Sequence, residues 1–164
     1  MNLDGMKKVD KILNNKKYQK SLDKIKKCEK NRKYCRHDME HFLSVARICY
    51  VLNLEMGLGI SKEIIYVASL LHDIGRHKQY EDKIPHEIAS SQIARKILID
   101  CGFEFEEIEI IVEAISKHRD KNNSINDLNG ILYRADKLSR NCFSCKMSEK
   151  CNWSYDKKNS TVKY

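Results

Sequence analysis

Apolar residues recur at intervals of three and four along most of this chain, the spacing that places them on one face of an α-helix. Beyond residue 36, five such segments cover residues 38–56, 61–75, 85–102, 105–117 and about 126–140. Gly57, Gly75 and Gly102 stand where the first three should end, since glycine commonly terminates helices. No stretch alternates apolar and polar residues as a strand does, and no internal repeat is present. The pattern predicts an all-α helical bundle.

The first 36 residues carry the excess positive charge, with 13 Lys and Arg against 4 Asp and Glu, whereas the remainder holds 18 and 19. Apolar residues recur at helical spacing on both sides of a break at Asn14–Asn15. Clustered lysines of this kind can contact nucleic acid or face water on a docked helix. Aromatic stacking residues are sparse and no recognition motif is present, so we favour a basic helical arm packed on the body over a nucleic-acid contact.

Length and composition place limits on the class of protein. The chain has 164 residues, 41% of them hydrophobic, which suits one soluble domain with a real core. No stretch approaches the roughly 18 apolar residues of a membrane span, and the N-terminus lacks the apolar centre of a secretion signal. We therefore expect a cytoplasmic protein without a membrane partner. Oligomeric state has no clear signal in the sequence.

Four histidines and two aspartates lie on the apolar stripes of the five predicted helices. His41, for example, precedes Val45 and Ile48 by four and seven residues, so it shares their inward face. The full set is His41, His72, Asp73, His86, His118 and Asp136. A single histidine on such a stripe is more often a hydrogen-bonded core residue than a ligand. Six buried polar side chains together would lack partners unless a cation gathered them, and imidazole and carboxylate suit transition metals.

These residues, in this order and in the contexts "HFLSVA" and "LYRADKLSR", resemble the HD-domain superfamily of metal-dependent phosphohydrolases over residues 37–140. The HD dipeptide alone is a weak signal, whereas the ordered set is specific. The resemblance implies an HD-domain bundle around a buried metal centre of two divalent ions, iron, manganese, cobalt or nickel. It implies that one ion is held by His41, His72, Asp73 and Asp136. His86 and His118 match the extra ligands of the two-metal branch, in which Asp73 would bridge both ions.

Two cations roughly 3.5 to 4 Å apart can activate a shared water and clamp a phosphate during displacement. The predicted function is therefore hydrolysis of a small phosphorylated substrate, and resemblance to small bacterial two-metal HD hydrolases favours a nucleotide. Basic residues beside the ligands are candidates for binding the phosphate oxygens, although each could equally serve surface solubility: Arg76, Arg119, Lys137 and Arg140. His37 lies one turn before His41 and is predicted, with Asp73, to take part in catalysis, either by donating a proton or by supporting the ligands.

Two other functions fit the same ligand set. Some HD-fold proteins with two irons activate oxygen instead of water, and ligand identity does not separate the two reactions. A sensor that binds a nucleotide or metal without turnover is the third alternative. An intact set of six ligands argues against the sensor, because a binding module needs no activated water.

The segment 141–164 contains a second cluster, "CFSCKMSEKC". It places Cys142, Cys145 and Cys151 as C-x2-C-x5-C, a spacing that lets thiolates converge on zinc or an iron–sulfur cluster. Cys35 is the candidate fourth ligand, because the helices that follow Cys35 and precede Cys142 should meet at the metal centre. The alternative is a set of reduced thiols that pack beside Phe143 and Trp153. Sequence alone does not separate zinc from a cluster.

Overall fold

The structure, a computed structural model, describes residues 6–164, which form eight α-helices and two short 3-10 turns and contain no strand. The helices are α1 (Lys7–Leu13), α2 (Lys16–Cys28), α3 (Met39–Glu55), α4 (Lys62–Leu71), α5 (Arg76–Asp82), α6 (His86–Asp100), α7 (Phe105–Lys117) and α8 (Leu128–Leu138). The prediction of an all-α bundle is confirmed. The first five residues of the predicted basic arm lie outside the described residues.

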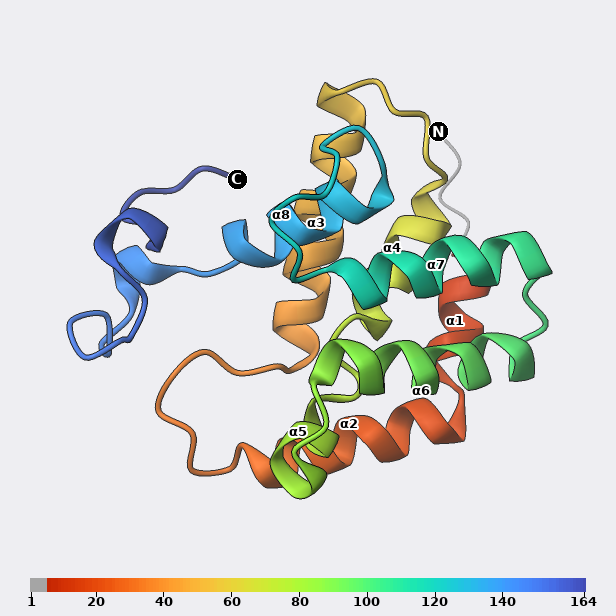
Figure 1. The fold of residues 1–164 in the computed structure, drawn as a ribbon, viewed down its shortest axis with the longest axis horizontal. Coiled ribbons are helices and arrows are strands. Elements are labelled where there is room, and N and C mark those ends of the chain that lie inside the picture. Colours follow the sequence, from red (N-terminus) through yellow and green to blue (C-terminus); the bar gives the residue numbers. More distant parts are fainter. Residues whose placement is uncertain (1–5) are drawn as a thin grey trace.

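Helix α3 forms the centre of the bundle, where it packs against α4 and α8 (Figure 1). Helices α6 and α7 lie side by side and pack against each other. Their inward faces are apolar, and fully buried Phe42, Leu71, Ile97 and Ile115 contribute to one continuous core. Burial of this apolar surface is the main source of stability, at roughly 25 cal/mol per Å². None of the helices in the described part of the chain is both long and apolar enough to cross a membrane.

The two helices of the basic arm share this core. Asn15 is the N-terminal cap of α2, because its side chain accepts hydrogen bonds from the backbone amides of Lys17 and Tyr18. Ile12 and Ile25 are buried, with α1 packed on α4 and α2 on α5. The predicted helices on both sides of Asn14–Asn15 are therefore confirmed. The division of the chain into arm, HD domain and tail at residues 36 and 140 stays a prediction.

The helix predicted over residues 61–75 is wrong at its end. Helix α4 stops at Leu71, residues 72–75 form a turn, and α5 begins directly afterwards, a helix that the sequence did not predict. Gly75 does not end a helix in a left-handed conformation, since its φ is −88°. Its backbone amide donates to Ser90 Oγ at 2.9 Å, and a Cβ here would overlap the backbone of Ser90 and Ala89. Glycine is needed because the turn lies directly against α6.

The other predicted helix ends agree closely with the structure. Gly57 and Gly102 follow α3 and α6 with φ values of 62° and 71°, the left-handed conformation that favours glycine. Helix α8 is shorter than its predicted range of 126–140. It begins after Asp127 because that side chain accepts the amide of Gly130 as an N-terminal cap.

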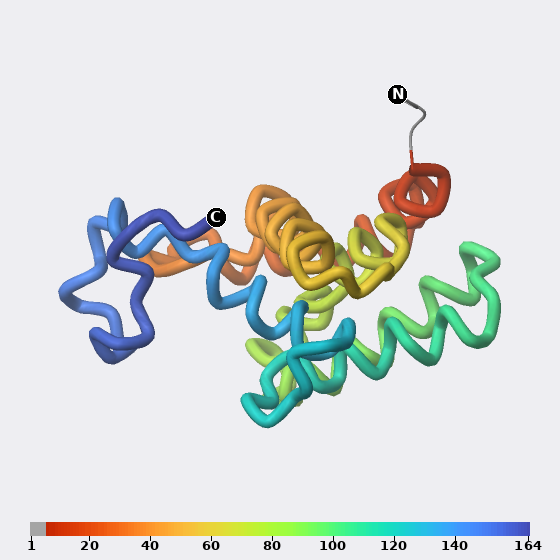
Figure 2. Tube along the Cα trace, turned by 90° about the horizontal axis from the view of Figure 1, so that it is seen from above, coloured from red at the N-terminus to blue at the C-terminus, as the bar shows by residue number. Residues whose placement is uncertain are grey.

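The segment after α8 differs from the rest of the molecule. It contains only the 3-10 turns η1 (Cys142–Ser144) and η2 (Tyr155–Lys157), and we call residues 141–164 the tail. Figure 2 shows the tail at one end of the molecule, beside the loop that joins α2 to α3. The hydroxyl of Tyr34 in that loop donates to the carbonyl of Lys150 at 3.2 Å.

Candidate metal centre

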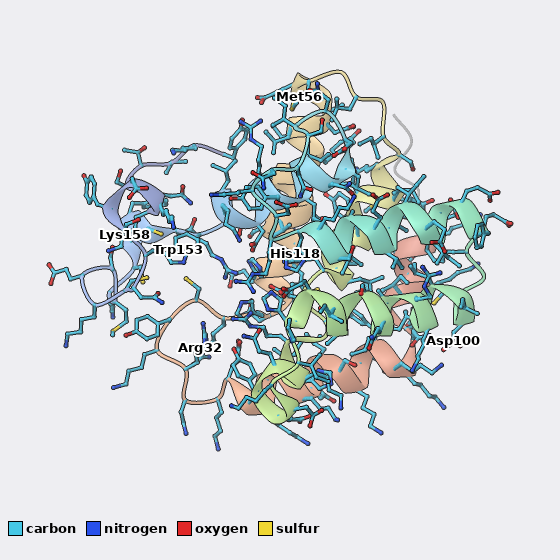
Figure 3. The ribbon with its side chains drawn as sticks, in the orientation of Figure 1. Arg32, Met56, Asp100, His118, Trp153 and Lys158 are labelled. Atoms are coloured by element: carbon cyan, nitrogen blue, oxygen red, sulfur yellow. The ribbon has the colours of Figure 1, made fainter. Side chains whose placement is uncertain are left out.

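The six side chains that the sequence singled out converge on one point in the bundle. His41 comes from α3, His86 is the first residue of α6, and Asp136 lies in the last turn of α8. His72 and Asp73 form the turn after α4, and His118 follows the last residue of α7. All six are buried, and Figure 3 shows His118 in the middle of the molecule, where these elements meet.

The side chains form two groups of ligand atoms, and within each group all the atoms lie within 4.8 Å of one another. The first group contains His41, His72, Asp73 and Asp136. The second group contains Asp73, His86 and His118. Each group could hold a metal ion, which supports the prediction of a buried metal centre. The role of each residue as a ligand stays a prediction.

Asp73 belongs to both groups because its two oxygens face different neighbours. Oδ2 lies 3.2 Å from His72 Nε2 and 3.8 Å from His41 Nε2. Oδ1 lies 3.1 Å from His86 Nε2 and 3.6 Å from His118 Nε2. Asp73 could therefore contribute one oxygen to each group.

Two of the histidines are oriented by backbone carbonyls. The Nδ1 atom of His72 lies 2.6 Å from the carbonyl oxygen of Ser69, and that of His118 lies 2.6 Å from the carbonyl of Ile115. A carbonyl only accepts, so each Nδ1 carries the proton and donates. The other ring nitrogen, Nε2, faces Asp73 in both residues, the orientation that metal-binding histidines require.

The six side chains together have the donor atoms that a divalent transition metal prefers. His72 Nε2 and Asp73 Oδ1 are buried and have no hydrogen-bond partner. A buried polar atom without a partner costs about 1–3 kcal/mol. A cation would satisfy both atoms at once, and a set of imidazole nitrogens and carboxylate oxygens suits iron, manganese, cobalt or nickel.

The electrostatics of the cluster favour a positive ion. Burial raises the pKa of Asp73, but His72 and the neighbouring histidines outweigh it and hold that pKa well below its usual value. Burial lowers the pKa of His41 to about 4 and that of His86 to about 3, so both rings are neutral at neutral pH. At His72, burial opposes the charged ring, but Asp73 and Asp136 outweigh it and raise the pKa to about 10. The two carboxylates thus draw positive charge to this point.

His37 lies beside the cluster and is held by a pair that the sequence did not reveal. Its Nε2 is 3.7 Å from Asp73 Oδ2, and its Nδ1 is 2.5 Å from Glu29 Oε1. Glu29 also accepts the hydroxyl of Tyr80 at 2.6 Å. Burial raises the pKa of Glu29, but the hydrogen bonds from His37 and Tyr80 outweigh it and lower that pKa to about 2. The sequence held one indication of this pair, because Glu29 is the only acidic residue in the basic stretch 24–36.

A cavity of about 470 Å³, the central cavity, opens beside the cluster and is lined by Asp73 and Asp136. The four basic residues predicted to bind phosphate all line it, with Arg32 of the arm as a fifth that was not predicted: Arg32, Arg76, Arg119, Lys137 and Arg140. Arg119 is exposed, with its Nη1 at 3.5 Å from Glu87 Oε2. The central cavity therefore offers an anion several positive charges next to the candidate ligands.

Three of these cations contact the cluster directly. Arg76 Nη1 lies 2.6 Å from His86 Nδ1, and Lys137 Nζ lies 2.6 Å from Asp136 Oδ2. Arg140 Nη2 lies 3.3 Å from Asp136 Oδ1. This position argues against a role in surface solubility alone, because the charged ends of the three side chains contact the buried cluster. Binding of a substrate by them stays a prediction.

The four candidate cysteines also come together, at one side of the central cavity. Cys35, Cys142, Cys145 and Cys151 line a second cavity of about 270 Å³, which we call the cysteine cavity. All four thiols are free.

Comparison with known proteins supports this description of the site. The family model of the HD domain matches residues 38–141. An uncharacterized protein of Clostridium beijerinckii is 50% identical over 153 residues, 93% of this chain and 96% of that protein. No solved structure matches the chain.

Two relatives of named activity are more distant. Ribonuclease Y of Mycoplasma mycoides is 29% identical over 106 residues, 65% of this chain but 23% of that protein. The bifunctional uridylyltransferase/uridylyl-removing enzyme of Cereibacter sphaeroides is 37% identical over 83 residues, 51% of this chain and 8% of that enzyme. The chain thus spans less than a quarter of either relative. Because the family model matches most of its helices, this protein belongs to the HD-domain family.

Proposed function

We propose that this protein is a metal-dependent phosphohydrolase that acts on a nucleotide or another small phosphorylated metabolite. The observation that carries the proposal is Asp73, whose two oxygens face two separate groups of ligand atoms at the wall of a cationic cavity. Two divalent transition metals held by these groups would supply an activated water and neutralise charge on the phosphate. The residues around them supply binding, orientation and proton transfer.

The cations of the central cavity bind the phosphate. Arg76 and Arg119 approach from the side of the second group, whereas Lys137 and Arg140 approach from Asp136 in the first group. Guanidinium and ammonium groups on both sides neutralise the non-bridging oxygens, whose negative charge grows during displacement. The same contacts orient the phosphate relative to Asp73.

His37 is placed to move a proton. Its Nδ1 hydrogen bond to Glu29 fixes the ring, so that Nε2 faces Asp73 and the central cavity. A proton on this Nε2 can pass to the oxygen of the leaving group as the phosphate bond breaks. Glu29 and Tyr80 act through His37, as positioning residues.

The size and lining of the central cavity favour a small nucleotide as substrate. Its volume of about 470 Å³ lies in the range of small-molecule sites. Tyr34 and Trp153 line it together with the cations, and a base can stack on an aromatic face. This combination of aromatic and cationic side chains suits a base and a phosphate in one molecule.

The test is a phosphate-release screen over nucleoside mono-, di- and triphosphates and sugar phosphates. The full chain is purified anaerobically and loaded with ferrous, manganous, cobaltous or nickel ion. We expect phosphate release by the wild type, and a loss of at least about 100-fold in His72→Ala because the first group loses a ligand. His77→Ala is the matched control, since His77 is equally buried but lies outside both groups.

Other outcomes favour the alternatives. Turnover that requires oxygen and releases no phosphate would identify an oxygenase. Tight nucleotide binding by the metal-loaded protein without turnover would identify a sensor. Either result overturns hydrolysis.

A further inference from the structure

The tail holds a defined position without a hydrophobic core. Asn159 is its only buried residue, and Phe143 and Tyr155 are exposed by 48% and 81%, whereas Trp153 is half-buried. None of its residues joins the core cluster of the bundle. Ordering each backbone residue costs about 1–2 kcal/mol, and this segment has little apolar burial to offset it. Thiols packed beside Phe143 and Trp153 would be poorly covered, because Phe143 is exposed and Trp153 is only half-buried. A cross-link accounts better for the position of the tail.

The four cysteines provide the place for such a cross-link. Cys35 comes from the loop between α2 and α3, and the other three come from the tail, yet all four line the cysteine cavity. Burial raises the pKa of the Cys35 thiol and the charge of Arg140 lowers it, while charge on Cys142, Cys145 and Cys151 would raise it, as expected for sulfurs close together. Two segments more than 100 residues apart thus present their thiols to one space.

We propose that Cys35, Cys142, Cys145 and Cys151 bind an iron–sulfur cluster of the four-iron type, which fastens the tail to the loop between α2 and α3. This inference is independent of the proposed reaction, because it rests on residues outside both groups of the metal centre.

The separation of the sulfur atoms favours a cluster over a single ion. Four thiolates on one zinc ion, at Zn–S distances of about 2.3 Å, would lie roughly 3.8 Å apart. Among the described residues, no three of the cysteine sulfurs lie within 4.8 Å of one another. All four instead line the cysteine cavity, which has a volume of about 270 Å³. A cubane of iron and sulfide fills such a space and holds its four thiolates farther apart than one ion does.

The charges around the cysteine cavity suit a negatively charged cluster. Four thiolates outweigh the charge of the iron–sulfide core, so the bound cluster is anionic. Four basic residues line the cavity against two acidic ones: Lys33, Arg36, Arg140 and Lys158 against Asp38 and Glu40. Cations at close range stabilise thiolate ligands and the anion that they hold.

The cluster would also shape the central cavity. Cys35, Cys142 and Cys151 line that cavity as well, beside Trp153 of the tail. Figure 3 shows Trp153 on the tail and Arg32 on the loop, on the same side of the molecule. A cluster that joins these two segments therefore fixes one wall of the central cavity.

The experiment uses the full chain, purified anaerobically and supplied with ferrous iron and sulfide. We expect a broad visible charge-transfer absorption, about four acid-labile sulfides per chain, and an electron paramagnetic resonance signal after reduction with dithionite. Cys142→Ser and Cys151→Ser should lower bound sulfide at least about tenfold. Cys28→Ser is the matched control, because Cys28 is a free cysteine outside the cysteine cavity.

Iron at the metal centre is separated from cluster iron by His72→Ala, which should keep its full complement of sulfide. If the serine variants do not fold, the sulfide content and the resonance signal of the wild type decide the question. Stoichiometric zinc without sulfide would overturn the cluster. Free thiols without metal or sulfide would overturn any metal at this position.

Discussion

The two groups of ligand atoms that share Asp73 differ in charge. The first group adds the carboxylate of Asp136, whereas the second adds only histidines. In the second group, the guanidinium of Arg76 also lies 2.6 Å from His86 Nδ1. Positive charges lie beside both groups, since Lys137 and Arg140 contact Asp136. The difference that remains is a second carboxylate and one more ligand residue in the first group. We infer that the first group holds its metal more tightly.

The largest effect is expected from Asp73→Asn, which removes the charge that the two groups share. Both groups lose their common carboxylate, so we expect bound metal to fall from two ions to less than one and hydrolysis to fall at least about 1000-fold. Elemental analysis and phosphate release measure the two quantities. Asp82→Asn is the control, because Asp82 is exposed and pairs only with Lys78 at 2.7 Å. A variant that keeps two ions would show that Asp73 does not bridge them.

Single substitutions in each group sharpen the comparison. His86→Ala should release one ion and keep the other, with hydrolysis reduced about 100-fold. His41→Ala should weaken the tighter ion, and the wild type should release its two ions at chelator concentrations that differ at least about tenfold. Chelator titration followed by elemental analysis measures both. Release of both ions together would contradict the difference in charge between the groups.

A smaller effect is expected from Gly75→Ala, which substitutes none of the candidate ligands. The added methyl group overlaps the backbone of Ser90 and Ala89, so the turn that carries Asp73 must move away from α6 and His86. We expect a loss of about 1–3 kcal/mol in the free energy of unfolding and about tenfold in hydrolysis. Denaturant titration and phosphate release measure these.

Gly59→Ala is the matched control for this substitution. Its φ of 69° strains any side chain, but nothing lies within 4 Å of the added methyl group. Its cost should appear in stability alone. Equal losses of hydrolysis in the two variants would show that the close approach of the turn to α6 does not position Asp73.

Most of the fold could be predicted because its helices carry long apolar stripes. The helix that was missed, α5, is seven residues long and has only His77 buried, so it has no stripe to recognise. The end of α4 was misplaced because Gly75 was read as a helix terminator, whereas its role is close packing on α6. A contact between two helices distant in sequence cannot be recognised from the spacing of apolar residues within either one.

The candidate ligands could be predicted for a related reason, since each lies on or beside an apolar stripe and therefore points inward. The support of His37 by Glu29 and Tyr80 could not be predicted, because it joins the arm to the unpredicted helix α5. The cysteine spacing predicted a site in the tail. The sequence also named Cys35 as the fourth cysteine of that site, but only the structure places the cysteine cavity beside the central cavity.

The smallest effect on the reaction is expected from Glu29→Gln, which keeps the shape of the side chain that holds His37. Hydrolysis should fall only severalfold, because His37 loses a charged partner but keeps its place near Asp73. The stability of the protein gives a sharper readout. The pKa of Glu29 is lowered from 4.5 to about 2, so its contribution is fully present above pH 4.5 and is lost as the pH falls toward 2.

Glu29→Gln should therefore be less stable than the wild type at neutral pH, by at most about 3 kcal/mol, and this difference should shrink between pH 4.5 and 2. Denaturant titrations of both proteins across this range measure the difference, with Glu106→Gln as an exposed control on α7. A difference that does not change with pH would show that Glu29 acts through packing. A difference that disappears on acidification ties the buried carboxylate of the arm to His37, and thereby makes the basic arm part of the site instead of a separate attachment.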